Sequence, residues 1–120
     1  MPMDSVLAAL SQLRVGFQPM EQNLHRAVEG ALHAAGIEYC HEARAGRCRL
    51  DFLTADGIAI EVKRGRPLPS VAGQLARYAA LPQVTGVVLV APRAYPLPKT
   101  LAGKPCAVVA LQKLWGVSVS

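Results

Sequence analysis

Apolar residues in the first third of the chain recur with the period of a helix. Residues 4–14 predict a short helix that Asp4 or Ser5 can cap, and residues 20–35 predict a longer one whose apolar stripe includes Leu24. A glycine directly after the second stripe is typical of the end of a helix. Two amphipathic helices are therefore expected before the first strand.

The remainder of the chain mixes strand and helix patterns. Alternating apolar and polar positions predict three strands, and a later valine-rich run predicts a strand buried on both faces. A helix that Ser70 can cap lies between them, and a proline-rich connection precedes the last strand. The predicted segments are strands at 37–43, 47–54 and 58–64, a helix at 71–81, a strand at 84–91, an irregular connection at 92–105 and a strand at 106–111.

The order of these segments predicts the fold class. Strands joined by short turns pair as antiparallel hairpins, whereas a helix between two strands makes a crossover to a parallel neighbour. The chain therefore predicts an α/β protein with a mixed β-sheet flanked by helices and an αβββαβ core. At 120 residues the chain is expected to form one domain, residues 1–120.

Charge and cysteine content narrow the functional classes. A formal net charge of +5 favours an anionic partner, with nucleic acid the first candidate. The three cysteines are odd in number and widely spaced, which favours a reducing compartment, the cytoplasm, over a disulfide framework. No apolar run is long enough to cross a bilayer, so no membrane partner is expected.

One predicted hairpin, LDFLTADGIAIEVKRG at residues 50–65, carries charged residues inside its strands. A two-residue turn would pair Asp51 with Val62 and place a carboxylate and a valine on the same face. A three-residue turn at 55–57, with its glycine in the left-handed conformation, would instead pair Asp51 with Glu61. We predict the three-residue turn, because it collects the apolar residues of both strands on one core face, namely Leu50, Phe52, Ile58, Ile60 and Val62.

Two carboxylates directly opposite each other in a sheet repel, at a cost of roughly 0.2–1 kcal/mol. A divalent cation reverses the sign of that interaction, because hard oxygen ligands suit Mg²⁺ or Mn²⁺. Lys63 lies on the same face as Glu61 and adds a positive charge that can orient a water molecule or offset charge on a phosphoryl group. Asp51, Glu61 and Lys63 together predict phosphodiester hydrolysis; the alternative is a solvated hairpin face with a Glu61–Lys63 ion pair.

The hairpin belongs to a longer series of motifs. In chain order these are a glutamate near the start of a helix, an aspartate followed by a Glu-x-Lys triplet, and a Gln-x-x-x-Tyr pair on a later helix: Glu21, then Asp51 with Glu61, Val62 and Lys63, then Gln74 and Tyr78. The series resembles the PD-(D/E)XK nuclease superfamily, and the last pair resembles the QxxxY motif of its RecB-like exonuclease branch. In overall look the chain is most similar to small phage and prophage nucleases, including resolvase-like and virus-type replication-repair (VRR-NUC-like) members.

The resemblance covers residues 20–91 and shows two departures. Leu50 stands before Asp51, where many members have proline. The histidine typical of RecB-type exonucleases has no clear match, since His25 lies in the first predicted long helix and His41 on the first predicted strand.

The resemblance implies a restriction-endonuclease-like fold and a Mg²⁺- or Mn²⁺-dependent deoxyribonuclease, either as a monomer or as a homodimer. It implies that the metal is held by four groups: Asp51, Glu61, the backbone carbonyl of Val62, and Glu21. It further implies that Lys63 positions the attacking water and that Gln74 and Tyr78 hold the water or the DNA backbone.

Arginines gather in the sequence around the predicted carboxylate site. This concentration favours contacts with DNA phosphates over a role in solubility alone, and the residues are Arg44, Arg47, Arg49, Arg64, Arg66 and Arg77. The alternative function is a catalytically inactive nuclease-fold module that binds nucleic acid or a partner protein. The complete set of acids with a lysine favours the nuclease.

Overall fold

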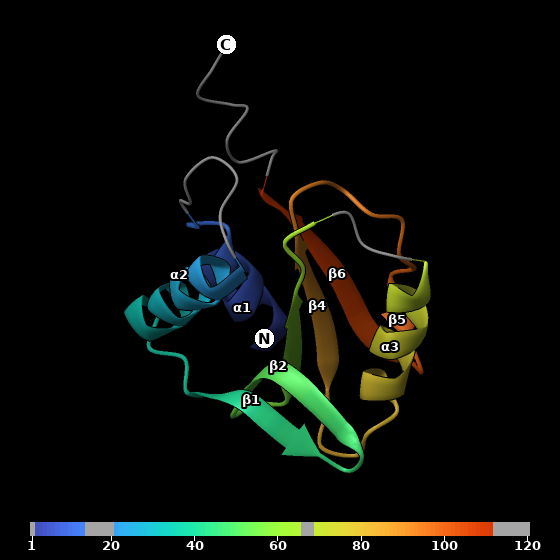
Figure 1. The fold of residues 1–120 in the computed structure, drawn as a ribbon. Coiled ribbons are helices and arrows are strands. Elements are labelled where there is room, and N and C mark those ends of the chain that lie inside the picture. The colour runs from blue at the N-terminus through green and yellow to red at the C-terminus, as the bar shows by residue number, and fades with distance from the viewer. Residues whose placement is uncertain (1, 14–20, 66–68, 112–120) are drawn as a thin grey trace.

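A mixed six-stranded β-sheet forms the centre of the part of the protein that the computed structural model describes, residues 2–13, 21–65 and 69–111. Figure 1 shows the sheet and the helices around it. In chain order the elements are α1 (Pro2–Leu10), α2 (Glu21–Ala34), β1 (Tyr39–Ala45), β2 (Cys48–Thr54), β3 (Ile58–Val62), α3 (Ser70–Ala79), β4 (Gly86–Ala91), β5 (Thr100–Leu101) and β6 (Lys104–Ala110).

The strands lie across the sheet in the order β1-β2-β3-β4-β6-β5. Antiparallel pairing joins β1 to β2 and β2 to β3, whereas α3 carries the chain over to β4, which pairs parallel with β3. β6 runs parallel to β4, and the short β5 pairs with it antiparallel. The structure therefore confirms a mixed sheet flanked by helices and contains the predicted αβββαβ order.

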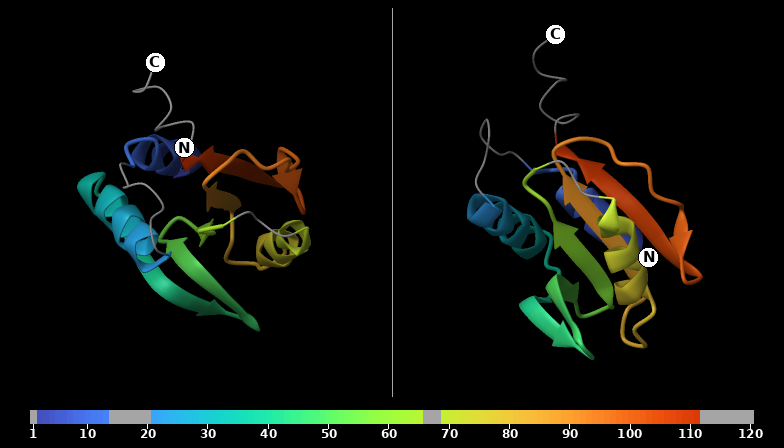
Figure 2. Two further views of the ribbon diagram at one scale, coloured as in Figure 1. Left: turned by 45° about the horizontal axis from the view of Figure 1, so that its top comes forward. Right: turned by 45° about the vertical axis from the view of Figure 1, so that its right-hand side comes forward.

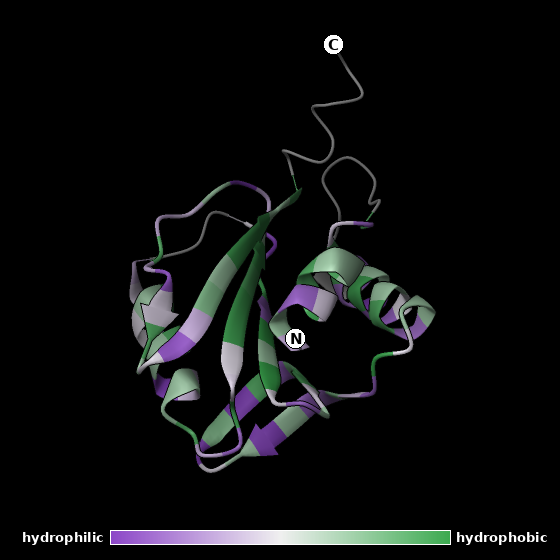
Figure 3. Ribbon diagram, turned by 180° about the vertical axis from the view of Figure 1, so that it is seen from behind, coloured by the Kyte–Doolittle hydropathy of each residue, from purple (hydrophilic) through white to green (hydrophobic). Residues whose placement is uncertain are grey.

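Helices cover both faces of the sheet (Figure 2). α1 and α2 pack on one face over an apolar cluster, and α3 packs on the other face over a second cluster. The first cluster includes Leu10, Leu24, Leu32, Phe52 and Ile60, and the second includes Leu50, Ala59, Leu75, Tyr78 and Leu89. Viewed from behind, the central strands are hydrophobic, whereas the β1–β2 hairpin alternates hydrophilic and hydrophobic positions (Figure 3).

One prediction about the core face is wrong at Leu50. Strict alternation would place Leu50 beside Phe52, yet Leu50 packs in the α3 cluster while Phe52 packs under α1 and α2. The β1–β2 ladder is interrupted between these two positions: Glu42, opposite Asp51, adopts a φ of 54°, and no pairing is formed there. A local break of this kind increases the twist of a strand and re-aims its side chains, so simple alternation fails across it.

Several element boundaries also differ from the predicted ones. Ser70 is the first residue of α3 rather than its cap, because Pro69 occupies the N-cap position. No side-chain hydrogen bond caps this end of the helix. The connection at 92–105, predicted to be irregular, contains β5 and the start of β6. Ala102 and Gly103 both have positive φ angles, which is the geometry of a tight hairpin turn.

Among the helices that the structure describes, none has both the length and the apolar character required to span a membrane.

Candidate functional site

The turn between β2 and β3 determines which charged side chains meet. Phe52 pairs with Ile60 in the ladder, as predicted for a three-residue turn. Gly57 has a φ of 93°, its N–H donates to the Thr54 carbonyl at 2.9 Å, and a Cβ added to it would lie 2.6 Å from a backbone oxygen. Glycine is therefore required at this position, and the predicted turn is confirmed.

Beyond the Phe52–Ile60 pair, the Asp51 side chain replaces a ladder hydrogen bond. Its Oδ2 accepts the Val62 N–H at 2.8 Å. The carboxylate is thereby fixed against the end of β3, next to Glu61, and 23% of the Asp51 side chain remains exposed. The predicted backbone pair of Asp51 with Glu61 is not part of the ladder, but the two carboxylates lie close enough for the charge of Asp51 to act on Glu61.

Glu61 is the most unusual charged residue of the site, because it is 4% exposed. Its Oε2 lies 3.0 Å from Lys63 Nζ, but its Oε1 is buried without a hydrogen-bond partner. The pKa of Glu61 is raised to about 7, chiefly by burial and then by the charge of Asp51, while Lys63 lowers it in part. A buried carboxylate oxygen with no donor is a costly arrangement that either a proton or a cation would relieve.

The backbone of Val62 faces the same place. Lys63 N–H donates to the Val90 carbonyl of β4 at 2.8 Å. Because the peptide bond is trans, the Val62 carbonyl points the opposite way, toward β2 and Asp51. The carboxylates of Asp51 and Glu61 and this carbonyl can therefore converge on one point at the fork between β2 and β3.

α3 brings its predicted pair to the same fork. Gln74 Nε2 donates to the Tyr78 hydroxyl at 2.7 Å, and that hydroxyl donates to the Arg49 carbonyl at 3.1 Å. Burial raises the pKa of Tyr78 to about 12, and the charge of Glu61 adds to the rise. Tyr78 is therefore a neutral hydrogen-bond donor that ties α3 to β2 beside the carboxylates.

Sequence reasoning found no role for His25 and His41, although the structure brings both to the site. His25 Nε2 lies 3.8 Å from Asp51 Oδ2, and His25 Nδ1 lies 2.8 Å from His41 Nε2. The contacts continue outward, since His41 Nδ1 is 4.0 Å from Glu29, which accepts a hydrogen bond from the Tyr39 hydroxyl at 3.0 Å. Helical spacing from Glu21 was the one available signal for His25, because residues four apart share a helix face.

The remaining predicted site residues are Glu21 and the arginines, and the structure describes only some of them. Glu21 begins α2, but its side chain lies outside the described part of the structure, and so does all of Arg66. The other five arginines lie in three places along the fold. Arg44, Arg47 and Arg49 belong to the β1–β2 hairpin and Arg77 to the last turn of α3, whereas Arg64 follows β3.

Exposure leaves these arginines accessible to a ligand. All five are exposed, and Arg49 forms a surface ion pair with Glu42 at 2.9 Å. Such an exposed pair contributes at most about 1 kcal/mol, so it would compete weakly with a phosphate.

A metal ion is compatible with the donors at the fork. Among the described residues no group of three or more histidine, cysteine, aspartate or glutamate side chains is spaced to hold a metal. Two carboxylates with a backbone carbonyl nevertheless form a typical partial shell for Mg²⁺, which keeps several waters. The buried Glu61 Oε1, which lacks a partner, is the observation that favours a cation here.

Comparisons of this chain with family models, with curated proteins and with solved structures find no match.

Proposed function

We propose that this protein is a Mg²⁺- or Mn²⁺-dependent nuclease that hydrolyses phosphodiester bonds of DNA on a restriction-endonuclease-like fold. The observation that carries the proposal is the buried Glu61 beside Asp51, with one oxygen lacking a partner and the other held by Lys63. A structural ion pair has no need of a second carboxylate next to it, because the two acids repel each other.

The groups that would hold the metal are the carboxylates of Asp51 and Glu61 and the carbonyl of Val62. His25 offers a nitrogen donor on the other side of Asp51, at 3.8 Å from its Oδ2. When bound, a divalent cation supplies charge neutralisation at the phosphoryl oxygens and lowers the pKa of a water molecule.

Lys63 keeps its ammonium group beside Glu61 and is half-exposed, so it can also contact a substrate oxygen or orient the attacking water. Tyr78 and Gln74 hold α3 against the fork and limit the access of water to Glu61. The arginines of the hairpin and of the β3 end supply positive charge for the DNA backbone on both sides of the fork.

The test is cleavage of single-stranded, duplex and branched DNA with Mg²⁺, with Mn²⁺ or with EDTA. The wild-type protein is expected to cleave only with a metal, and Asp51→Asn is expected to lose at least about 100-fold in rate. Asp56→Asn is the matched control, because Asp56 is an exposed aspartate in the turn of the same hairpin. Cleavage that persists in EDTA and in Asp51→Asn would refute the metal site.

A second candidate is a non-cutting module of the same fold that binds nucleic acid. The 3.0 Å contact between Lys63 and Glu61 favours it, since this ion pair partly neutralises Glu61 without a metal. Binding of DNA without cleavage under either metal would select this candidate. Calorimetric titration with Mn²⁺ separates the two candidate functions independently. Only the nuclease requires a bound cation, and Asp51→Asn should lower the affinity for that cation.

A further inference from the structure

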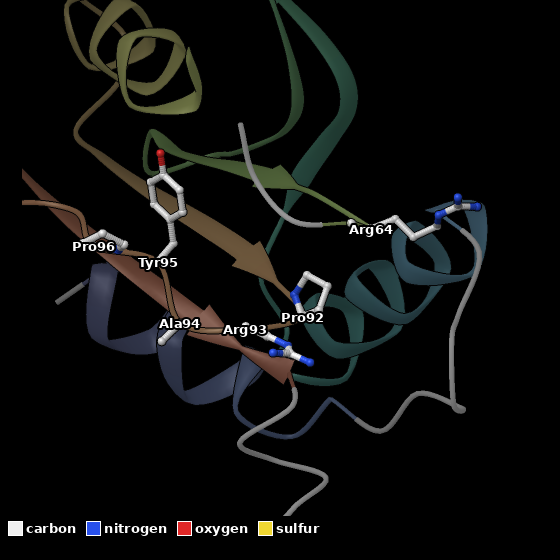
Figure 4. A pocket seen from close by; sticks show the side chains of 7 residues that line it. Arg64, Pro92, Arg93, Ala94, Tyr95 and Pro96 are labelled. Atoms are coloured by element: carbon white, nitrogen blue, oxygen red, sulfur yellow. The ribbon is translucent and has the colours of Figure 1, made fainter. Parts of the chain in front are cut away.

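A second site lies at the carboxyl ends of the parallel strands β3 and β4. A cavity of about 680 Å³ is bounded there by the residues that follow each strand. Arg64 and Gly65 follow β3, whereas Pro92, Arg93 and Tyr95 follow β4 (Figure 4). In open α/β sheets, ligands bind outside the carboxyl ends of parallel strands.

The cavity adjoins the carboxylate fork. Val62 pairs with Val90 in the parallel ladder, and the Lys63 N–H donates to the Val90 carbonyl at 2.8 Å. Arg64 and Pro92, each two residues beyond this pair, therefore leave the sheet at the same level. Tyr95 packs against the hydrophobic cluster under α3, on the same sheet face as Tyr78. The fork and the cavity are therefore neighbours along β3.

The lining chemistry fits a nucleotide. Arg64 and Arg93 are exposed, and neither forms an ion pair with a residue that the structure describes. Arginine binds phosphate through a planar fork of donors, and a tyrosine ring offers a face on which a base can stack. Figure 4 shows the Tyr95 ring and the Arg64 guanidinium on opposite sides of Pro92, so phosphate and base would have separate contacts.

We propose that this cavity binds one unpaired nucleotide of a DNA strand whose neighbouring phosphate lies at the fork. A single nucleotide fits a cavity of this size, and a base that stacks on the Tyr95 ring must leave the stack of a duplex. The substrate class is therefore a single-stranded end, flap or gap rather than continuous duplex. This inference rests on the proposed nuclease function for the position of the scissile phosphate.

The experiment measures equilibrium binding in EDTA, so that cleavage plays no part. A fluorescein-labelled oligodeoxythymidylate and a blunt duplex are titrated with wild type, Arg93→Gln, Tyr95→Leu and Tyr95→Phe. Lys99→Gln is the matched control, because Lys99 is an exposed cation on the same connection outside the cavity.

Arg93→Gln is expected to weaken binding of the single strand about fivefold and to reduce the slope of affinity against salt by about one. Tyr95→Leu is expected to weaken binding of the single strand about tenfold and to remove the preference for single strand over duplex. Tyr95→Phe keeps the aromatic ring and should keep that preference. Because Arg93 is exposed, its variant remains informative even if Tyr95→Leu fails to fold.

Arg93→Gln binding as tightly as Lys99→Gln would overturn the inference, as would a preference for duplex in the wild type. Loss of binding in Arg93→Gln together with a wild type that never cleaves would support the cavity and refute the nuclease. Metal-dependent cleavage by the wild type together with unchanged binding in Arg93→Gln would support the nuclease and refute the role of the cavity.

Discussion

The face of the sheet under α1 and α2 is built from apolar side chains, whereas the face under α3 buries a glutamate and a tyrosine hydroxyl among them. Both faces draw on the same strands, since Ile60 points to one and Glu61 to the other. Burial of apolar area stabilises the first face. The second face contains a destabilising group, which is typical of sites where function sets the residue.

The largest expected effect concerns activity on the α3 face. Glu61→Gln removes the negative charge of one carboxylate of the fork and should reduce metal-dependent cleavage by about 1,000-fold, because both a charged cation ligand and the ion pair with Lys63 are lost. Initial rates on labelled DNA measure this. Glu38→Gln, at an exposed glutamate, should cleave at the wild-type rate.

The largest expected loss of stability concerns the opposite face. Leu24→Ala removes a side chain that is 1% exposed and should lower the free energy of unfolding by about 2–5 kcal/mol. Urea denaturation followed by circular dichroism gives the value. Leu81→Ala, at a half-buried leucine near the β1–β2 turn, should cost less, and an equal loss would show that the depth of burial does not set the cost.

The third prediction is the pH dependence of stability. The pKa of Glu61 rises from 4.5 to about 7 on folding, so the native state binds this proton more tightly than the unfolded state. The contribution of Glu61 to the free energy of unfolding is therefore largest below pH 4.5 and is lost as the pH rises through about 7. The expected loss between pH 5 and pH 8 is roughly 2–3 kcal/mol.

Comparison of wild type with Glu61→Gln isolates that contribution, because other groups titrate in both proteins. The difference between their unfolding free energies at pH 5 and at pH 8 should carry the predicted slope. Mn²⁺ should stabilise the wild type more at pH 8 than at pH 5, since the cation competes with the proton. Parallel curves for the two proteins would contradict the burial of a titrating Glu61.

The smallest expected effect is at the edge of the site. Tyr78→Phe removes the hydroxyl that joins Gln74 to the Arg49 carbonyl, and it should cost about 0.5–1.5 kcal/mol of stability. Thermal unfolding measures the change. Tyr95→Phe, at a half-buried tyrosine on the same face, serves as the comparison for loss of a hydroxyl that does not bridge Gln74 to Arg49.

Much of the fold could be predicted from periodicity. The two N-terminal helices, the three successive strands, the crossover helix and the valine-rich β4 follow from local patterns of apolar residues, which short segments carry by themselves. The β5 hairpin is not predictable from periodicity, because the prolines of this segment hide the strand pattern and its turn depends on Ala102 and Gly103. Alternation predicts the wrong face for Leu50, because the break in the ladder at Glu42 lies in a different strand.

The candidate site was predictable only in its centre. Asp51, Glu61 and Lys63 follow from alternation and the length of one turn, both of which are local. Whether Glu21 joins them is still a prediction, since its side chain lies outside the described residues. The five predicted arginines that the structure describes are spread over the β1–β2 hairpin, the end of α3 and the residue after β3. Sequence proximity does not fix the direction of an exposed side chain, so it does not show whether they act together.

By itself, the sequence determined most of the elements, the register of the β2–β3 hairpin and the proximity of two carboxylates, because each depends on residues close together in the chain. Only the tertiary structure decided how deeply Glu61 is buried, that α3 places Tyr78 beside it, that His25 lies beside Asp51, and that a cavity opens where the chain leaves β3 and β4. Those properties depend on the packing of α2, α3 and the end of β4 around one point. Contacts between segments that are far apart in the chain leave no periodic trace in it.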